Sequence, residues 1–226
     1  MIKKIDIAGI QLDNYTFRET IMQIERMIND SVFHTLEEVN MDILMQAQSD
    51  ERVKTALQNL NLTILTEYEI LDAAGEKSTQ RKHEIESKNV FYETLKRVER
   101  NHMSVFLLGE KEEDIIRMKE YICQEFPKIR LGGMEAVKNC VEEMEAAVNE
   151  INAATVDIVI SVLPSPQQEL FLLQHKEKIS ARLWYGVDKS KFVKKKSGLW
   201  ESLCRKIRLH RLELHISKYE EQEVDK

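Results

Sequence analysis

The stretch that decides the fold is residues 103–133, "MSVFLLGEKEEDIIRMKEYICQEFPKIRLGG". It is continuously apolar up to Gly109 except for one serine, which is typical of a strand buried on both faces. A helix is expected over about 112–125, followed by a weaker strand in which Gly132 and Gly133 mark a turn. The order strand, helix, strand predicts two parallel strands joined by a covering helix.

The same alternation extends over the rest of the chain. Residues 2–12 predict an opening strand or hairpin, and helices are expected over about 16–27 and 135–153. Further strands are expected in "VFHTLEEVN" (32–40), "LNLTILT" (60–66), "VDIVISVL" (156–163) and "ARLWYGV" (181–187). Residues 76–89, "EKSTQRKHEIESKN", are almost free of apolar side chains and predict a solvated loop or mobile flap. The fold class is therefore α/β, with a Rossmann-like, mostly parallel sheet covered by helices on both faces.

Charge divides the chain into two parts. The 226 residues carry a net charge of −6, yet residues 189–218 hold ten Lys and Arg against two Glu. We therefore expect an α/β domain over 1–188 and a basic helical appendage over 189–226. Such a charge contrast indicates an anionic partner for the appendage.

Several classes of protein are disfavoured by the composition. The three cysteines lie far apart with no CxxC pair, and no histidines stand at metal-ligand spacing, so we expect reduced thiols, no catalytic metal and no bound cofactor. The N-terminal segment does not read as a secretory signal, and no apolar run has transmembrane length, so we expect a cytoplasmic location. No nucleic-acid recognition motif accompanies the basic segment, so nucleic acid is not an expected partner.

Two prolines, Pro164 and Pro166, stop the apolar run of residues 156–163. Proline cannot donate to a strand ladder but suits the first turn of a helix. Gln167, Gln168 and Glu169 are then expected at a helix start beyond the carboxyl ends of the strands, where ligands of such sheets gather. There they either read a polar ligand with free amide groups or merely cap the helix.

The order of these segments resembles that of the WecB/TagA/CpsF family of bacterial glycosyltransferases. The similarity runs through nearly the whole chain, and its most specific short match is "PSPQQE" (164–169), which is similar to the family's Pro-x-Gln-Glu element. The resemblance implies an inverting, N-acetylmannosaminyltransferase-like enzyme. Such an enzyme moves an aminosugar from a UDP-sugar to a polyprenyl-diphosphate-linked acceptor at the inner membrane face.

The resemblance also assigns candidate residues. Glu67, in the place of the Asp of a Pro-Asp-Gly element, is the implied catalytic base, although it also reads as a solvated loop glutamate. Glu38 replaces a hydroxyl residue of a Thr-x-Asn element and is the poorer candidate for the base. Asn40 is kept, and it also reads as the N-cap of the following helix. The implied substrate-binding residues are Asn40, Arg81, Gly109, Gln167, Gln168, Glu169, Arg205 and Arg208.

Other positions depart from the family pattern. Glu110 stands where a second glycine is expected after Gly109, and "VDKSKF" (187–192) replaces a glycine-rich stretch. These changes remove backbone access and add acid near the place where a diphosphate would bind. The transferase hypothesis therefore requires an open cavity beside Gln168. The alternative hypothesis is a catalytically inactive relative that acts as a membrane-associated binding or scaffold partner of an active transferase.

The appendage predicts an amphipathic helix with a membrane role. Trp200, Leu203 and Ile207 lie on one helical stripe, flanked by basic residues. Such a helix suits an anionic membrane surface, with the tryptophan at the headgroups. The expected membrane-association residues are Trp200, Leu203, Ile207, Lys194, Lys195 and Lys196. A helix that packs on the body or on another subunit of a homo-oligomer is the alternative.

Overall fold

The computed structural model describes residues 4–137, 141–192 and 199–224. Its centre is a six-stranded parallel sheet with the strand order β4-β3-β8-β7-β5-β6. The strands are β3 (His34–Val39), β4 (Leu62–Leu65), β5 (Ser104–Gly109), β6 (Arg130–Ala136), β7 (Ile158–Ser161) and β8 (Leu183–Gly186). The predicted α/β class with a parallel central sheet is confirmed.

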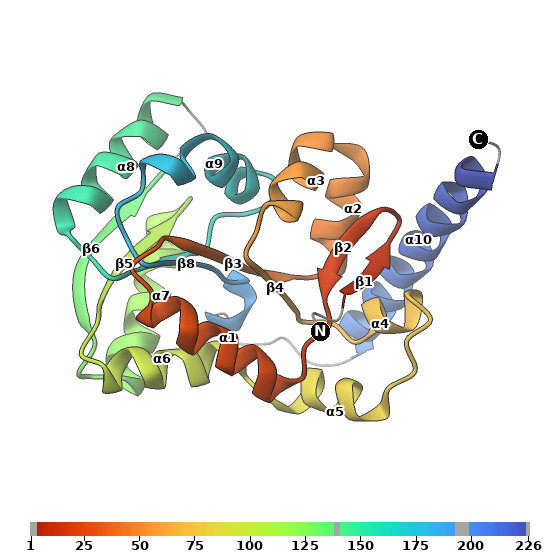
Figure 1. Ribbon diagram of the computed structural model, residues 1–226, viewed down its shortest axis with the longest axis horizontal. Coiled ribbons are helices and arrows are strands. Elements are labelled where there is room, and N and C mark those ends of the chain that lie inside the picture. The colour runs from red at the N-terminus through yellow and green to blue at the C-terminus, as the bar shows by residue number, and fades with distance from the viewer. Residues whose placement is uncertain (1–3, 138–140, 193–198, 225–226) are drawn as a thin grey trace.

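Helices cover both faces of this sheet (Figure 1). One face carries α2 (Met41–Ser49), α3 (Glu51–Gln58), α8 (Val141–Ala154) and α9 (Gln167–His175). The other carries α1 (Phe17–Asn29), α6 (Val90–Arg100) and α7 (Glu112–Glu125). Because strand side chains alternate between faces, each strand contributes to two separate cores. Tyr185 packs in the core under α1, α6 and α7, whereas the adjacent Trp184 packs in the core under α8 and α9.

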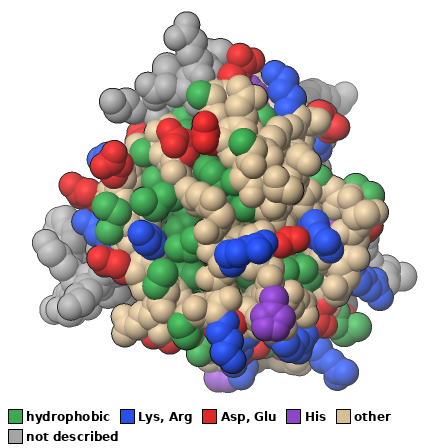
Figure 2. All heavy atoms as spheres, turned by 90° about the vertical axis from the view of Figure 1, so that its left-hand side faces the viewer, with side chains coloured by type: hydrophobic (Ala, Val, Ile, Leu, Met, Phe, Trp, Pro, Cys, Tyr) green, Lys and Arg blue, Asp and Glu red, His purple; other side chains and the backbone are tan. Residues whose placement is uncertain are grey.

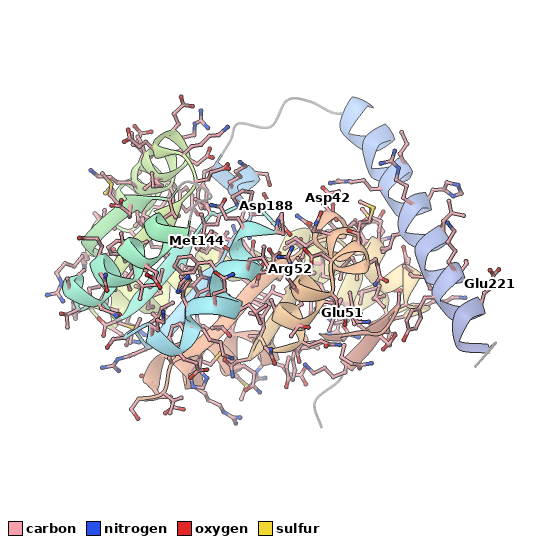
Figure 3. All side chains as sticks on the ribbon, turned by 90° about the horizontal axis from the view of Figure 1, so that it is seen from above. Asp42, Glu51, Arg52, Met144, Asp188 and Glu221 are labelled. Atoms are coloured by element: carbon pink, nitrogen blue, oxygen red, sulfur yellow. The ribbon has the colours of Figure 1, made fainter. Side chains whose placement is uncertain are left out.

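A third core joins the two ends of the chain. The N-terminal hairpin, β1 (Lys4–Ile7) and β2 (Ile10–Asp13), packs with α2, α3 and α4 (Glu69–Ala73). The C-terminal helix α10 (Leu199–Val224) contacts α2 and α4 and buries Leu212 completely in this core. Figure 3 shows α10 along the end of the molecule that is farthest from α8. The appendage is thus helical, and it packs on the body.

Three local predictions were wrong. Residues 79–87 form a helix, α5 (Thr79–Ser87), capped by Ser78, rather than a loop; it buries no residue, which explains the missing apolar periodicity. Gly132 and Gly133 lie inside β6 and not in a turn. An added Cβ would lie 2.4 Å from the Val156 side chain at the first and 2.7 Å from the Phe106 ring at the second, so close packing requires both glycines. The expected helix over 135–153 begins at Val141, because β6 continues to Ala136.

Short elements complete the part of the chain that the structure describes. They are two 3-10 turns, Lys176–Lys178 and Lys189–Phe192. Figure 2 shows the side of the molecule on which β6 lies, where hydrophobic side chains gather among scattered acidic and basic ones. On this edge strand Met134 is 48% exposed. No helix of the described residues is both long and apolar enough to cross a bilayer.

Candidate functional site

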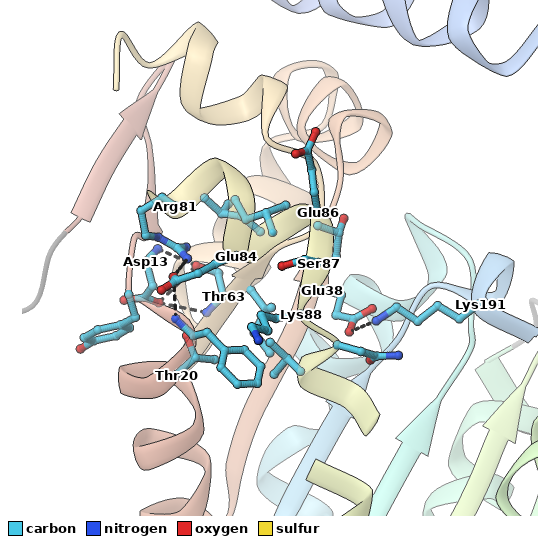
Figure 4. Close-up of a pocket in the computed structure, with 18 residues that line it drawn as sticks. Asp13, Thr20, Glu38, Thr63, Arg81, Glu84, Glu86, Ser87, Lys88 and Lys191 are labelled. Carbon is cyan, nitrogen blue, oxygen red and sulfur yellow. Dashed lines mark hydrogen bonds and ion pairs between the residues drawn. The ribbon is translucent and has the colours of Figure 1, made fainter. Parts of the chain in front are cut away.

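A cavity of about 300 Å³ lies beside the carboxyl ends of β3 and β4, between the sheet and helices α1, α5 and α6. Its lining includes Glu38 from β3, Arg81 from α5 and Lys191 from the turn that follows β8 (Figure 4). Three segments far apart in the sequence therefore meet at the sheet edge where parallel α/β folds bind ligands. Gln168 is buried and is not among the described residues that line it. The expectation of an open cavity beside Gln168 is therefore wrong, and the transferase hypothesis has to rest on the cavity beside Glu38 instead.

Two buried acids, Glu38 and Asp13, line this cavity. Asp13 uses Oδ1 on Lys4 and Oδ2 on Thr63, so neither of its oxygens is unpartnered. Glu38 differs from Asp13 in this respect. Its side chain is 1% exposed, and its Oε1 accepts a hydrogen bond from the Tyr185 hydroxyl at 3.0 Å and pairs with the Lys191 ammonium. The other oxygen, Oε2, is buried and has no hydrogen-bond partner among the described residues. Burial, together with the nearby Glu38, raises the pKa of Tyr185 well above its usual value, so the phenol stays protonated and donates.

Arg81 reaches the cavity from helix α5. Its Nε donates to Asn14 Oδ1 at 3.0 Å and its Nη1 to Glu84 Oε2 at 2.9 Å. Glu84 in turn accepts from the Phe17 N–H, which ties α5 to the start of α1. The Arg81 side chain is 12% exposed and its guanidinium is held by Asn14 and Glu84, so it can add only a limited contact to a ligand.

Glu67, the implied base, follows β4 but faces away from the cavity toward α2 and α10. Its Oε2 accepts the Met41 N–H at 2.7 Å, and its Oε1 accepts from Arg208 Nη2 at 3.0 Å. Burial raises the pKa of Glu67, and the Met41 N–H and Arg208 partly offset that shift. Two residues that the sequence places 141 positions apart, both assigned to substrate handling, are therefore in direct contact.

Asn40 has the capping role that the sequence left open. Its Oδ1 accepts the Ile43 N–H at 3.0 Å at the start of α2, and its Nδ2 donates to Asp188 Oδ2 at 3.1 Å. Asp188 lies near Asp42 when the molecule is seen from above (Figure 3). Arg208 also pairs with Asp42 at 2.9 Å, so one guanidinium bridges Asp42 and Glu67 near the start of α2.

The residues of the Pro-x-Gln-Glu element are enclosed on the opposite face of the sheet. Gln167 donates through Nε2 to the Val137 carbonyl at 3.1 Å, and Gln168 donates through Nε2 to Glu37 Oε1 at 2.9 Å. Both side chains are buried, as is Glu169. The expectation that these amide groups are free for a ligand is wrong for both nitrogens, because the protein itself takes up their hydrogen bonds.

Glu37 and Glu169 form a buried carboxyl pair above this face. Burial is the main cause of the raised pKa of each, and for Glu37 the neighbouring Glu169 adds to it. Two neighbouring carboxyls in an enclosed region are disfavoured as a doubly ionised pair, so the protonated forms are favoured over a wider pH range than for a free glutamate. Sequence analysis missed this pair because it gives no sign that β3 lies beneath α9.

The structure gives the surroundings of some of the remaining sequence-based candidates, while others lie outside the residues that it describes. Gly109 ends β5 away from the cavity; an added Cβ would lie 2.9 Å from the side chains of Ile115 and Val162, so it allows close packing of α7. On α10, Ile207 is 47% exposed and Arg208 faces the body. The side chains of Trp200, Leu203 and Arg205, and residues 194–196, lie outside what the structure describes.

Lys191 and Tyr185 are functional candidates that sequence reasoning missed. Lys191 belongs to the "VDKSKF" stretch, which attracted attention only for its missing glycines. A lysine in that stretch is a usable signal once β8 is known to lie beside β3. Among the described residues, no group of three His, Cys, Asp or Glu is arranged to hold a metal ion.

Comparison with known proteins places this arrangement in a family. The model of the glycosyl transferase WecG/TagA/CpsF family matches residues 5–192. The chain belongs to this family. Two Staphylococcus aureus proteins, from strains NCTC 8325 / PS 47 and MRSA252, are each 22% identical to it over 186 residues, which is 81% of this chain and 72% of theirs. Both are named N-acetylglucosaminyldiphosphoundecaprenol N-acetyl-beta-D-mannosaminyltransferase.

The match ends at Phe192, just after Lys191 and before α10. The cavity, Glu38, Arg81 and Glu67 therefore all lie within the part of the chain that carries the family resemblance. Arg208 and the rest of α10 lie outside it.

Proposed function

We propose that the chain transfers an N-acetylhexosamine from a UDP-sugar to a polyprenyl-diphosphate-linked acceptor, with inversion at the sugar. The observation that carries this proposal is the cavity beside the ends of β3 and β4, which brings the buried carboxylate of Glu38 together with Arg81 and Lys191. Inverting transfer needs a carboxylate for the acceptor hydroxyl and cations for the departing diphosphate. The names of the staphylococcal relatives supply the choice of sugar and acceptor to test first.

The cationic groups are proposed to act on the diphosphate. Arg208 is fixed at the rim by Glu67 and Asp42, and Arg81 is fixed within the cavity by Glu84. Fixed guanidinium groups stabilise charge that develops on a leaving group without having to reorient. Arg205 is proposed to assist them from the preceding turn of α10. No metal or cofactor is invoked.

The appendage is proposed to hold the enzyme at the inner face of the cell membrane. Helix α10 uses Leu212 to dock on the body, while Ile207 and Leu214 remain 47% and 49% exposed. Ile207 and Leu214 are seven positions apart, which is about two helical turns, so they lie on one stripe of the helix. By sequence spacing alone, Trp200 and Leu203 belong to that stripe. The basic residues 194–196 would add attraction of about 1 kcal/mol each to anionic lipid.

A UDP titration followed by thermal denaturation tests the donor site. A ligand that binds only the folded chain stabilises it by about 2.7 kcal/mol at a hundredfold excess over Kd. We expect a concentration-dependent rise in Tm with UDP. A chain whose Tm does not respond to millimolar UDP, with or without phosphatidylglycerol vesicles, does not have this donor site.

Transfer itself is measured with UDP-N-acetylmannosamine and N-acetylglucosaminyl-diphospho-undecaprenol, the pair that the relatives' names indicate. Formation of the lipid-linked disaccharide and release of UDP are the expected products. UDP-N-acetylglucosamine serves as the matched donor control, because it differs only in configuration at the sugar C2. Turnover with neither donor would contradict the proposed function.

The second candidate function is a non-catalytic partner of an active transferase. The observation that favours it is that the charged groups of the site are already paired with one another: Glu38 with Lys191, Glu67 with Arg208 and Arg81 with Glu84. A site built only for structure would keep these pairs when nucleotide is added. The absence of both the UDP response and turnover would favour this function.

A further inference from the structure

The carboxylate that can serve the reaction has to be identified among the acids at the sheet edge. A general base must come within about 2.6–3.2 Å of the hydroxyl whose proton it takes. Glu38 lines the cavity, whereas Glu67 does not. The two acids also differ in which of their oxygen atoms are occupied.

Both oxygens of Glu67 are in use. Oε2 holds the N-terminal N–H of α2, and Oε1 holds Arg208 of α10. A carboxylate that fastens two helices loses those contacts when it turns toward an acceptor. Glu67 therefore fits a positioning role, in which it orients Arg208 at the rim.

Glu38 is arranged in the opposite way. Tyr185 and Lys191 both bind Oε1, which fixes the carboxylate and offsets its charge. Oε2 is buried without a donor among the described residues. A buried carboxylate oxygen without a donor is unfavourable, so such an atom calls for an explanation. A ligand hydroxyl in the adjoining cavity would supply the missing donor.

We propose that Glu38, rather than Glu67, is the catalytic residue that accepts the proton of the acceptor hydroxyl; the inference rests on the transfer proposed above. The acceptor oxygen attacks the anomeric carbon of the donor sugar, and a new carbon–oxygen bond forms. The bond from that carbon to the β-phosphate oxygen breaks, and its electron pair leaves with UDP. The hydroxyl proton passes to Glu38 Oε2, so atoms and charge balance without a further reactant.

Three variants test this assignment in the transfer assay with full-length protein. Glu38→Gln keeps the shape and removes the base, so kcat is expected to fall about 10²–10⁴-fold with KM changed by less than about threefold. Glu67→Gln is expected to lower kcat less than about tenfold and to act mainly on KM through Arg208. Glu120→Gln removes an exposed acid of α7 that does not line the cavity, and its kinetics should match the wild type.

Folding of each variant is checked by its Tm and by the UDP-induced shift in Tm. If Glu38→Gln is unstable, Glu38→Asp keeps the charge but withdraws the carboxylate by about one methylene, and it should lose about a hundredfold in kcat. A wild-type chain that transfers no sugar refutes the proposed function. Wild-type turnover that survives within about tenfold in Glu38→Gln, or in Glu38→Asp where the former is unstable, refutes the inference alone.

Discussion

Glu37 and Glu38 are neighbours on the same strand, yet they lie in opposite environments. Glu37 faces α9 and is enclosed with Gln168 and Glu169, where burial and the neighbouring carboxyl raise its pKa. Glu38 faces a cavity and is balanced by a lysine that is 29% exposed. Because side chains alternate between the two faces of a sheet, two consecutive glutamates of one strand can have different roles. Glu37 contributes to the packing of the core, whereas Glu38 lines the candidate ligand cavity.

Replacing each glutamate with alanine should give the largest difference in stability between the two environments. Glu37→Ala removes the partner of Gln168 and Glu169 in an enclosed region, and we expect it to lower the free energy of unfolding by about 3 kcal/mol. Glu38→Ala opens onto a cavity that water can enter, so we expect about 1 kcal/mol. Urea denaturation of both variants measures this difference. Equal losses would mean that the two faces are equally closed.

The face of the sheet under α9, where Glu37 is enclosed, should also have no room for an added methyl group. A Cβ at Gly186 would lie 2.4 Å from Gln168 Nε2 and 3.0 Å from Glu37 Cγ. Gly186→Ala is therefore expected to destabilise the fold by about 2 kcal/mol through overpacking. The double variant with Gln168→Ala removes the obstructing amide, and its cost should be less than the sum of the single costs. Strict additivity would show that Gln168 does not pack against Gly186 as described.

The raised pKa values of Glu37 and Glu169 predict a pH dependence of stability that arises on the face of the sheet under α9. Because the folded pKa values of Glu37 and Glu169 are raised, their contribution to stability is fully present below the ordinary glutamate pKa. It is lost as the pH rises toward and through the raised values, and within that window each pH unit lowers the free energy of unfolding by up to about 1.4 kcal/mol for each proton that only the folded chain retains. An amide at position 37 can accept from Gln168 and donate to Glu169 without a proton.

Glu37→Gln should therefore flatten the pH profile above about pH 5 and raise stability at alkaline pH relative to the wild type. Glu86→Gln, at an exposed position, is the matched control and should leave the profile unchanged. The profiles come from chemical denaturation at a series of pH values. A Glu37→Gln profile as steep as that of the wild type would contradict the raised pKa of Glu37 as the source of the slope.

How much of this the sequence could predict depends on the range of the interactions involved. Local patterns predicted the parallel sheet and the capping role of Asn40, because periodicity and capping act within a few residues. Helix α5 was missed because it buries nothing, so no stripe marks it. Lys191 and Glu38 are 153 positions apart, and only the neighbouring positions of β3 and β8 in the sheet bring them together.

The resemblance carried other information that periodicity cannot. It grouped Glu67 and Arg208 in one site, and the structure brings their side chains to 3.0 Å. The resemblance also assigned residue roles by their position in a family motif. Such an assignment is weaker evidence where the residue type at that position has changed. From the sequence alone, Glu38 indicated only the loss of a ligand-binding hydroxyl group. Its oxygen without a donor, and the cavity beside it, become visible only in the fold.

The Glu67–Arg208 pair is intermediate between the two environments of β3, with side chains 18% and 29% exposed. A partly exposed ion pair contributes little, so a double-mutant cycle with Glu67→Gln and Arg208→Gln should give a coupling of about 1 kcal/mol or less. Hydrogen exchange of the α10 amides is the suitable measurement, because the pair fastens this helix to the body. Asp42→Asn, which removes the other carboxylate on Arg208, is the control for loss of charge at the rim. A coupling as large as the cost of Glu37→Ala would place Glu67 with the enclosed acids, and α10 would then be a fixed part of the core.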